Sequence, residues 1–295
     1  MKVFVTGATG WIGSATVDEL LHAGHEVVGL VRSDAAEAEL VAKGATPLRG
    51  DLDDLDALRR GAEAAEAVVH LANKHDWAHP EESNRAERAA VETLAGVLRG
   101  SDRPFALASG VAGLAQGRAA VETDDSRAVG PDSPRGGTER LALGTEGLHA
   151  IALRFAPTVH GMRDHGFVSV VAATARRTGV SAYVGDGAQA WSAVHRSDAA
   201  RLVRLGVEGA PAGSRLHAVA EEGVPVREIA EAIGRTLDVP VRSIDPEDAA
   251  AHFGFLGGFL AMDLRASSAA TRALLGWAPT GPTLLEDIAA GAYSA

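Results

Sequence analysis

The chain has 295 residues, 46% of them hydrophobic, which is enough to bury a full apolar core. A net charge of −11, without basic runs, excludes nucleic acid and anionic membrane surfaces as expected partners. The absence of cysteine excludes disulfides, thiolate nucleophiles and cysteine-rich zinc sites. No apolar stretch approaches a membrane span in length and no signal peptide precedes the first strand, so we expect a cytoplasmic protein.

The first predicted element is a short apolar strand that runs into a glycine-rich turn and a helix, VFVTGATGWIGSATVDEL. Glycines let the backbone turn tightly and approach a phosphate, whose charge then lies at the N-terminus of the helix predicted for Trp11–His22. A second strand, GHEVVGLVR, follows, and this context favours a dinucleotide site over a glycine turn without a ligand. The predicted cofactor contacts here are Gly7, Thr9, Gly10, Trp11, Ile12 and Gly13.

The second predicted strand ends in Arg32 and Ser33. An acidic residue at this point hydrogen-bonds a ribose 2′-hydroxyl, whereas an arginine can pair with a 2′-phosphate at two points. The sequence therefore favours NADP(H), with the Ser33 hydroxyl as a further contact. Asp34 lies one residue further on and weakens this preference. A solvated arginine at a strand end is the plain alternative.

Apolar runs then alternate with helical patterns. The second to sixth predicted strands are VVGLV, ATPLRG, AVVHLA, PFALAS and HAIALRF. This alternation predicts an α/β fold with a doubly wound parallel sheet, the Rossmann arrangement. Ligands of such sheets bind at the carboxyl ends of the strands. We therefore add Asp51 and Leu52 after the third strand, and Leu71, Ala72 and Asn73 after the fourth, to the cofactor site. Asp51 is also a candidate N-cap of the next helix.

The order of these motifs resembles that of the extended or atypical short-chain dehydrogenase/reductase superfamily, which is related to nucleotide-sugar epimerases and hydroxysteroid dehydrogenases. The matching segments cover nearly the whole chain and include TGATGWIG, HLA, LASG, LRFAPTVHG, VGDGAQAWSAVHRSDAAR and LLGWAPT. The resemblance implies an NADP-binding domain at residues 1–160, rejoined by 190–215, and a smaller C-terminal substrate domain at 161–189 and 216–295. It is compatible with a homodimer, which the residues do not decide.

The catalytic residues of that superfamily are only partly present. Its members use a serine, together with a tyrosine and a lysine that lie four residues apart on one helix. The tyrosine exchanges a proton with the substrate oxygen. Tyr183 and Tyr293 are the only tyrosines, and neither has such a lysine. Alignment of SPRGGTERLA with the superfamily pattern puts Arg135 at the tyrosine's place and Glu139 at the lysine's. We expect either a surface ion pair on one helix, or an Arg135 side chain that holds a substrate oxygen.

Ser109, at the end of the fifth predicted strand, falls where the superfamily has its catalytic serine. It could hydrogen-bond a substrate oxygen, or it could satisfy backbone groups at the strand end. Glu87 lies near the position of an asparagine in relatives. It could orient a water or a side chain beneath the site, or lie solvated on an amphipathic helix.

Another residue must then move the proton. The candidates are His165, Tyr183, His75, Asp76 and His195. His165 follows the loop after the sixth strand, which faces the nicotinamide in relatives, and an imidazole there titrates near neutral pH. The predicted catalytic residues are Ser109, Arg135, His165 and Tyr183.

Other parts of the chain carry weaker signals. The spacing of His70, His75 and His79 matches no zinc pattern, so we expect no metal site. The stretch from Gly113 to Gly137 is rich in Gly, Asp, Pro and Ser and predicts a long surface loop. Candidates to line an apolar pocket are Trp77, Phe167, Tyr183, Trp191, Phe253, Phe255 and Phe259.

Three kinds of function remain open, all with a small-molecule substrate or ligand. The preferred one is an NADP(H)-dependent oxidoreductase acting on a small organic carbonyl or alcohol, with a proton donor other than tyrosine. The second is a non-redox epimerase, dehydratase or isomerase that uses the bound nucleotide. The third is a catalytically silent NADP(H)-binding sensor.

Overall fold

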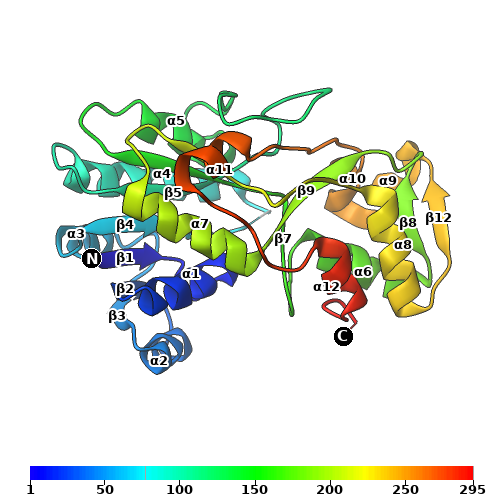
Figure 1. Ribbon diagram of the computed structural model, residues 1–295, viewed down its shortest axis with the longest axis horizontal. Coiled ribbons are helices and arrows are strands. Elements are labelled where there is room, and N and C mark those ends of the chain that lie inside the picture. The colour runs from blue at the N-terminus through cyan, green and yellow to red at the C-terminus, as the bar shows by residue number, and fades with distance from the viewer. Residues whose placement is uncertain (77, 295) are drawn as a thin grey trace.

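The computed structural model describes residues 1–76 and 78–294. In this part of the chain, one parallel sheet contains seven strands: β1 (Lys2–Thr6), β2 (Glu26–Val31), β3 (Thr46–Arg49), β4 (Ala67–His70), β5 (Phe105–Gly110), β6 (Ala150–Phe155) and β10 (Arg215–Ala218). Their spatial order is β10-β6-β5-β4-β1-β2-β3 (Figure 1). The chain thus leaves the central β1 toward β2 and β3, then crosses to β4 on its other side. This confirms the predicted doubly wound sheet, and its switch point lies between β1 and β4.

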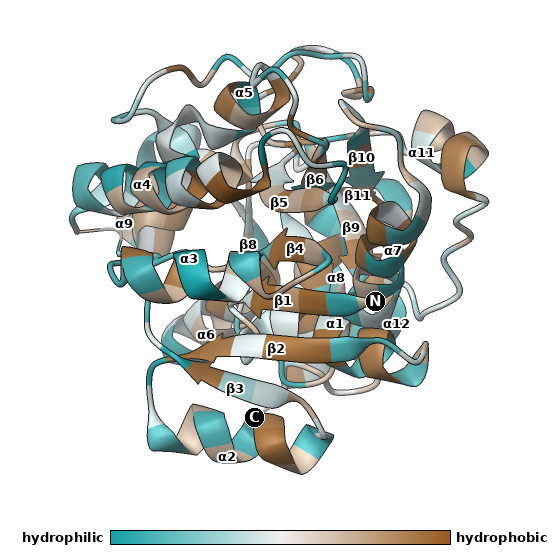
Figure 2. Ribbon diagram, turned by 90° about the vertical axis from the view of Figure 1, so that its left-hand side faces the viewer, coloured by the Kyte–Doolittle hydropathy of each residue, from teal (hydrophilic) through white to brown (hydrophobic). Residues whose placement is uncertain are grey.

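Helices cover both faces of the large sheet. One face carries α1 (Trp11–His22), α2 (Asp34–Lys43), α7 (Arg196–Gly209) and α11 (Ala269–Leu275). The other carries α3 (Leu55–Glu63), α4 (Pro80–Leu98) and α5 (Thr138–Leu143), which follows the 3-10 turn η1 (Pro134–Gly137). Successive side chains of a strand point to opposite faces, so Val3 and Val5 pack in the first core and Phe4 in the second. Figure 2 shows the apolar strands β1 and β2 beside helices of mixed hydropathy.

The remaining elements form a second region, at the right of Figure 1. Its strands are β7 (Thr158–His160), β9 (Ala190–His195) and β11 (Glu221–Pro225) in one sheet, and β8 (Ser181–Val184) and β12 (Val241–Ile244) in another. Its helices are α6 (Phe167–Thr178), α8 (Val226–Leu237), α9 (Ala249–Phe253), α10 (Gly257–Leu260) and α12 (Leu284–Ala289), with 3-10 turns η2 (Pro246–Asp248) and η3 (Gly254–Leu256). A separate apolar core holds this region together.

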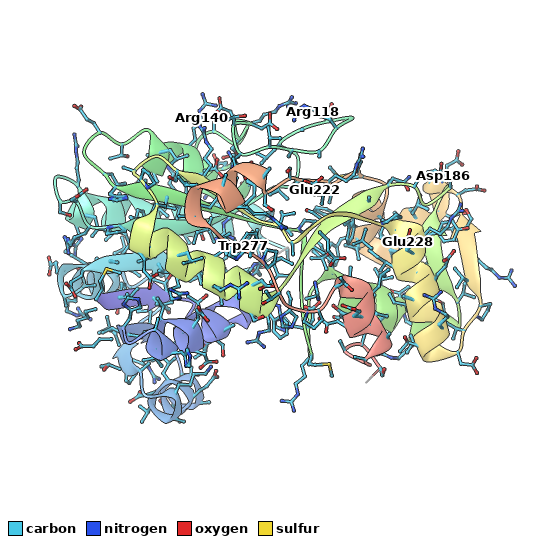
Figure 3. The ribbon with its side chains drawn as sticks, viewed as in Figure 1. Arg118, Arg140, Asp186, Glu222, Glu228 and Trp277 are labelled. Carbon is cyan, nitrogen blue, oxygen red and sulfur yellow. The ribbon has the colours of Figure 1, made fainter. Side chains whose placement is uncertain are left out.

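The chain passes between the two regions at points that differ from the boundaries drawn on the sequence. β10 is an edge strand of the large sheet, although most of it falls in the range assigned to the smaller domain. β9 pairs with β7 and β11 rather than with the large sheet, whereas α7 packs against α1. Trp277 is buried in the core of the large sheet, and its indole donates to the Asp198 carbonyl of α7 at 3.1 Å (Figure 3). Most of β10 and the residue Trp277 therefore belong to the first region, although the sequence ranges assign them to the smaller domain.

The segment between β5 and η1 forms no helix or strand among its described residues, as its composition predicts. It is nevertheless attached to the fold. The buried Glu122 accepts hydrogen bonds from the backbone N–H and the hydroxyl of Thr271, each at 2.7 Å. Over the described residues, no helix combines the length and the apolar character that a membrane span needs.

Candidate functional site

The glycine turn lies at the carboxyl end of β1 and leaves the start of α1 open. Gly7 has a left-handed φ of +68°, and a Cβ atom on Gly13 would lie 1.9 Å from the Gly7 carbonyl oxygen. α1 begins at Trp11 as predicted, and its N-cap, Gly10, makes no side-chain cap bond. The first turn of α1 also carries no acidic residue. Backbone N–H groups without a side-chain cap are what an anionic pyrophosphate group requires, so the turn fits the cofactor.

The end of β2 carries an exposed arginine, two residues before a carboxylate that forms an ion pair with another arginine. Arg32 is exposed. The Ser33 hydroxyl caps α2 by accepting a hydrogen bond from the Ala36 N–H at 3.3 Å. Asp34 lies 2.7 Å from the guanidinium of Arg49, at the end of β3. The acidic residue that weakened the cofactor preference therefore already has a cationic partner.

The turn after β3 carries Asp51 and Leu52 to the same edge of the sheet. The Asp51 carboxylate accepts from the N–H groups of Asp53 at 2.9 Å and Asp54 at 3.1 Å. Asp54, not Asp51, is the N-cap of α3, because its own carboxylate accepts from Ala57 N–H at 2.9 Å. The N-cap role considered for Asp51 was therefore wrong. Leu52 is buried in the core.

The end of β4 packs directly on the glycine turn. The Leu71 N–H donates to the Thr6 carbonyl at 3.2 Å, and the Ala72 N–H to the Thr6 hydroxyl at 3.3 Å. A Cβ atom on Gly7 would lie 2.8 Å from the Ala72 nitrogen. The residues predicted after the first and fourth strands thus lie side by side, and Asn73 continues from them.

A buried carboxylate, Glu87 on α4, lies beneath this edge and organises it. Its side chain is fully buried and accepts from the Asn73 amide at 3.0 Å and from the Arg135 guanidinium at 3.1 Å. The His70 Nε2 atom lies 3.3 Å from Glu87 Oε1, and the His70 Nδ1 atom shares a hydrogen bond with the Thr6 hydroxyl at 2.8 Å. Burial raises the pKa of Glu87, but Arg135, His70 and Asn73 outweigh burial and hold it at about 2.

Of the two alternatives considered for Glu87, the solvated position was therefore wrong, and the role of His70 was missed. A signal for both was present. The buried positions of α4 recur at helical spacing, and this row of Ser83, Glu87, Ala90, Val91, Leu94, Ala95 and Leu98 includes the glutamate. His70 ends a strand whose four residues are all buried, so its imidazole needs polar partners inside the protein.

Arg135 and Glu139 do not form the predicted pair on one helix. Arg135 has a left-handed φ of +50°, and it is followed by two left-handed glycines, so α5 begins only at Thr138. Glu139 instead binds the fully buried Arg154 of β6, with its Oε1 atom 2.5 Å from Nη2. The surface ion pair was thus wrong, because the turn separates the two side chains and each finds a partner elsewhere.

Ser109 lies near the carboxyl end of β5, one residue before its last residue, and is half-buried opposite Arg154 in the sheet register. The buried Arg154 also donates to the Glu122 carbonyl at 3.2 Å. This places an ion pair beside the strand end that carries the serine.

His165 and His75 approach the site from two loops. The His165 ring meets the edge of the Trp11 ring at a centroid distance of 5.5 Å, beside the start of α1. The Trp11 indole donates to the Val159 carbonyl of β7 at 2.7 Å, which ties the strand before the His165 loop to the start of α1. Burial lowers the pKa of the His75 imidazole; Arg135 lowers it further, Glu87 raises it and His165 lowers it. Arg135, Glu87 and His165 thus lie close enough to His75 to act on its charge.

Tyr183 does not lie with this group. It belongs to β8, at the end of the molecule opposite β2 and β3 in Figure 1, and the Arg227 guanidinium lies 5.0 Å from its ring centroid. The Phe167 ring packs in the core of the second region. Its centroid lies 5.9 Å from that of Trp191 and 5.3 Å from that of Phe259.

The other candidates have separate places. His195 caps α7, and Asp76 binds the His79 ring at 3.0 Å. Phe253 is buried in the core of the second region, Phe255 is largely exposed, and Trp77 lies outside the described residues. Within residues 1–76 and 78–294, no group of three or more His, Asp or Glu side chains could hold a metal ion.

Comparison with known proteins connects this fold to a family. The model of the NAD dependent epimerase/dehydratase family matches residues 3–214. An uncharacterized Schizosaccharomyces pombe protein is 46% identical over 295 residues, which cover 99% of this chain and 100% of that protein. A 4-hydroxy-2-methyl-3-oxo-4-farnesyl-3,4-dihydroquinoline-1-oxide ketoreductase of Stigmatella aurantiaca is 28% identical over 72% of this chain and 66% of its own.

A solved structure shows the same fold. The UDP-glucose 4-epimerase of Thermotoga maritima, solved with UDP-glucose, superposes with a TM-score of 0.77 and 20% identity, covering 100% of this chain and 98% of its own. Because the family match spans well over half of the chain, the protein belongs to the NAD-dependent epimerase/dehydratase family.

Proposed function

We propose that this protein is an NADP(H)-dependent oxidoreductase that reduces a small organic carbonyl compound, with a histidine in place of the superfamily's tyrosine as the proton donor. The observation that carries the proposal is the grouping of His75, His165, Arg135 and Glu87 beside the carboxyl ends of β1 and β4. This is the edge where cofactors and substrates of doubly wound sheets bind.

The cofactor preference rests on the end of β2. Arg32 is exposed there, and the carboxylate of Asp34 is paired with Arg49. A 2′-phosphate would gain charge-assisted hydrogen bonds from Arg32, whereas a ribose 2′-hydroxyl would lack a free carboxylate acceptor at Asp34. Both features support NADPH over NADH.

The reaction type rests on the site residues and on a relative. Bound NADPH would supply a hydride to the carbonyl carbon. Ser109 would hydrogen-bond the carbonyl oxygen, and His75 would deliver the proton to it, so that the carbonyl becomes an alcohol. The name of the Stigmatella aurantiaca relative, a ketoreductase, is consistent with this chemistry.

The first experiment titrates the protein with NADPH and with NADH, following nicotinamide fluorescence and the thermal midpoint. NADPH should bind more tightly. Arg32→Ala should weaken NADPH binding about tenfold, by the loss of one charge-assisted contact, and leave NADH binding unchanged. Arg242→Ala, an exposed arginine on β12, is the matched control. Equal binding of both nucleotides would overturn the NADP(H) assignment, and binding of neither would overturn the cofactor site.

The second experiment screens carbonyl compounds for NADPH oxidation and then replaces the histidines. His75→Gln should lower kcat about 100-fold or more, as expected for a general acid, with little change in NADPH affinity. His22→Gln, an exposed histidine of α1, is the control. Loss of activity only in His165→Gln would move the donor role to that residue.

Other outcomes would favour the alternatives. Full activity in both histidine variants would contradict a histidine donor. Tight NADPH binding without reduction of any carbonyl would favour a sensor, and an isomerised product without net NADPH oxidation would favour an epimerase or isomerase.

A further inference from the structure

We infer that Glu87 is a positioning residue for His75, which it holds through Asn73 and whose charge environment it balances through Arg135. The inference rests on the proposed function for its catalytic meaning. The physical link between Glu87 and His75 can be tested without any substrate.

The first link is a chain of hydrogen bonds from α4 to the loop after β4. The Asn73 amide donates to Glu87 Oε2 at 3.0 Å, and Asn73 Oδ1 accepts the backbone N–H of His75 at 2.9 Å. His75 has a left-handed φ of +50°. This conformation is uncommon for residues other than glycine, and it is held where the surrounding contacts favour it. The Asn73 side chain, oriented by Glu87, is one such constraint.

The second link is the ion pair with the turn before α5. Arg135 also has a φ of +50°, and its Nη2 donates to Glu87 Oε1 at 3.1 Å. A Cβ atom on the next residue, Gly136, would lie 2.4 Å from the Asn84 carbonyl oxygen, so the turn packs tightly on α4. Two residues with left-handed backbones, from separate segments, are thus tied to one buried carboxylate.

The third step concerns charge. Among the described residues, the charged or titratable side chains of Arg135, Glu87 and His165 act on the His75 ring. Asp76, next in the chain, is paired with His79 at 3.0 Å. Of these three groups, Glu87 carries the negative charge. Without the charge of Glu87, less would offset the positive charge of Arg135, and protonation of His75 would become harder.

The test measures the pKa of His75 by NMR titration of its ring C–H signal, assigned with His75→Gln. Glu87→Gln keeps the shape of the side chain and removes its charge. The pKa of His75 should fall by about half a unit or more. Glu92→Gln removes an exposed carboxylate from the same helix and should leave this pKa unchanged. An unchanged pKa in folded Glu87→Gln would overturn the inference.

A second variant keeps the test decisive if Glu87→Gln does not fold. Arg135→Gln removes the opposing positive charge and should raise the pKa of His75, and no change would overturn the inference. Turnover then separates the two proposals. Glu87→Gln should lower kcat and shift the pH profile of reduction to lower pH without weakening NADPH binding. A protein that reduces no carbonyl but shows these pKa shifts would contradict the proposed function alone.

Discussion

Gly13 is the residue whose replacement tests the glycine turn most directly. A Cβ atom there would lie 1.9 Å from the Gly7 carbonyl oxygen, so the turn and α1 must separate to admit it. We expect Gly13→Ala to abolish dinucleotide binding and to destabilise the protein by about 1–3 kcal/mol, as overpacking does. Nucleotide titration and urea unfolding measure the two effects.

The control for Gly13→Ala is Gly96→Ala. Gly96 is an exposed glycine of α4, and a Cβ atom there meets nothing within 4 Å. Alanine has the higher helix propensity, so this variant should be unchanged or more stable by about 0.5–1 kcal/mol. Retained nucleotide binding in Gly13→Ala would contradict the turn's assigned role.

The local structure of a residue could be predicted where it depends on its neighbours in the sequence. The start of α1 at Trp11 follows from the glycine turn, and the helix bounds were confirmed. The partners of Arg135 were not predictable. The carboxylate that binds Arg135 belongs to Glu87, 48 residues earlier in the chain. The left-handed glycines after Arg135 also break the helix that the alignment assumed. Helical spacing could have flagged the burial of Glu87, but not its partners.

At the scale of elements, one buried ion pair joins the short helix α5 to β6. Arg154 is fully buried, and Glu139 on α5 binds it through both carboxylate oxygens. Glu139→Gln would leave a buried guanidinium without its counter-charge, so we expect a loss of about 3 kcal/mol in the free energy of unfolding. Urea unfolding measures this loss.

Two further variants control the ion-pair prediction. Glu92→Gln, which breaks the exposed pair with Arg88, should change stability little. The double variant Glu139→Leu with Arg154→Met removes both charges and should recover part of the loss. An equal loss in the single and double variants would show that packing, not the unpaired charge, is responsible.

At the scale of the whole molecule, the order of elements was predictable but the division into regions was not. Alternating apolar runs specify a parallel sheet, because each strand needs a crossover helix. Which late strand returns to the large sheet depends on pairing over long separations. β10 pairs with β6, across more than fifty residues, and nothing local distinguishes it from β9, which pairs with β7 and β11. The sequence boundary therefore fell inside β10.

Within the second region, a buried histidine on β7 is bonded to the C-terminal helix α12, and its protonation should weaken the fold. His160 on β7 binds Asp287 on α12 at 2.6 Å, and burial lowers the pKa of His160 although Asp287 raises it. In the unfolded chain this pKa returns to about 6.5. Below that value the unfolded state binds more protons than the folded state, so the free energy of unfolding should fall as the pH falls through about 6.5.

Comparison of the wild type with a variant separates the contribution of His160 from those of Asp164 and Glu221. Burial raises the pKa values of these two carboxyl groups, so their effect on the pH dependence of stability is opposite to that of His160. His160→Gln cannot take up the proton. Its free energy of unfolding, measured with urea between pH 5 and 8, should therefore rise less with increasing pH than that of the wild type, even if the lost bond to Asp287 lowers it throughout. His22→Gln, at an exposed position of α1, should keep the wild-type slope. Equal slopes in His160→Gln and the wild type would mean that His160 does not link the C-terminal helix to pH.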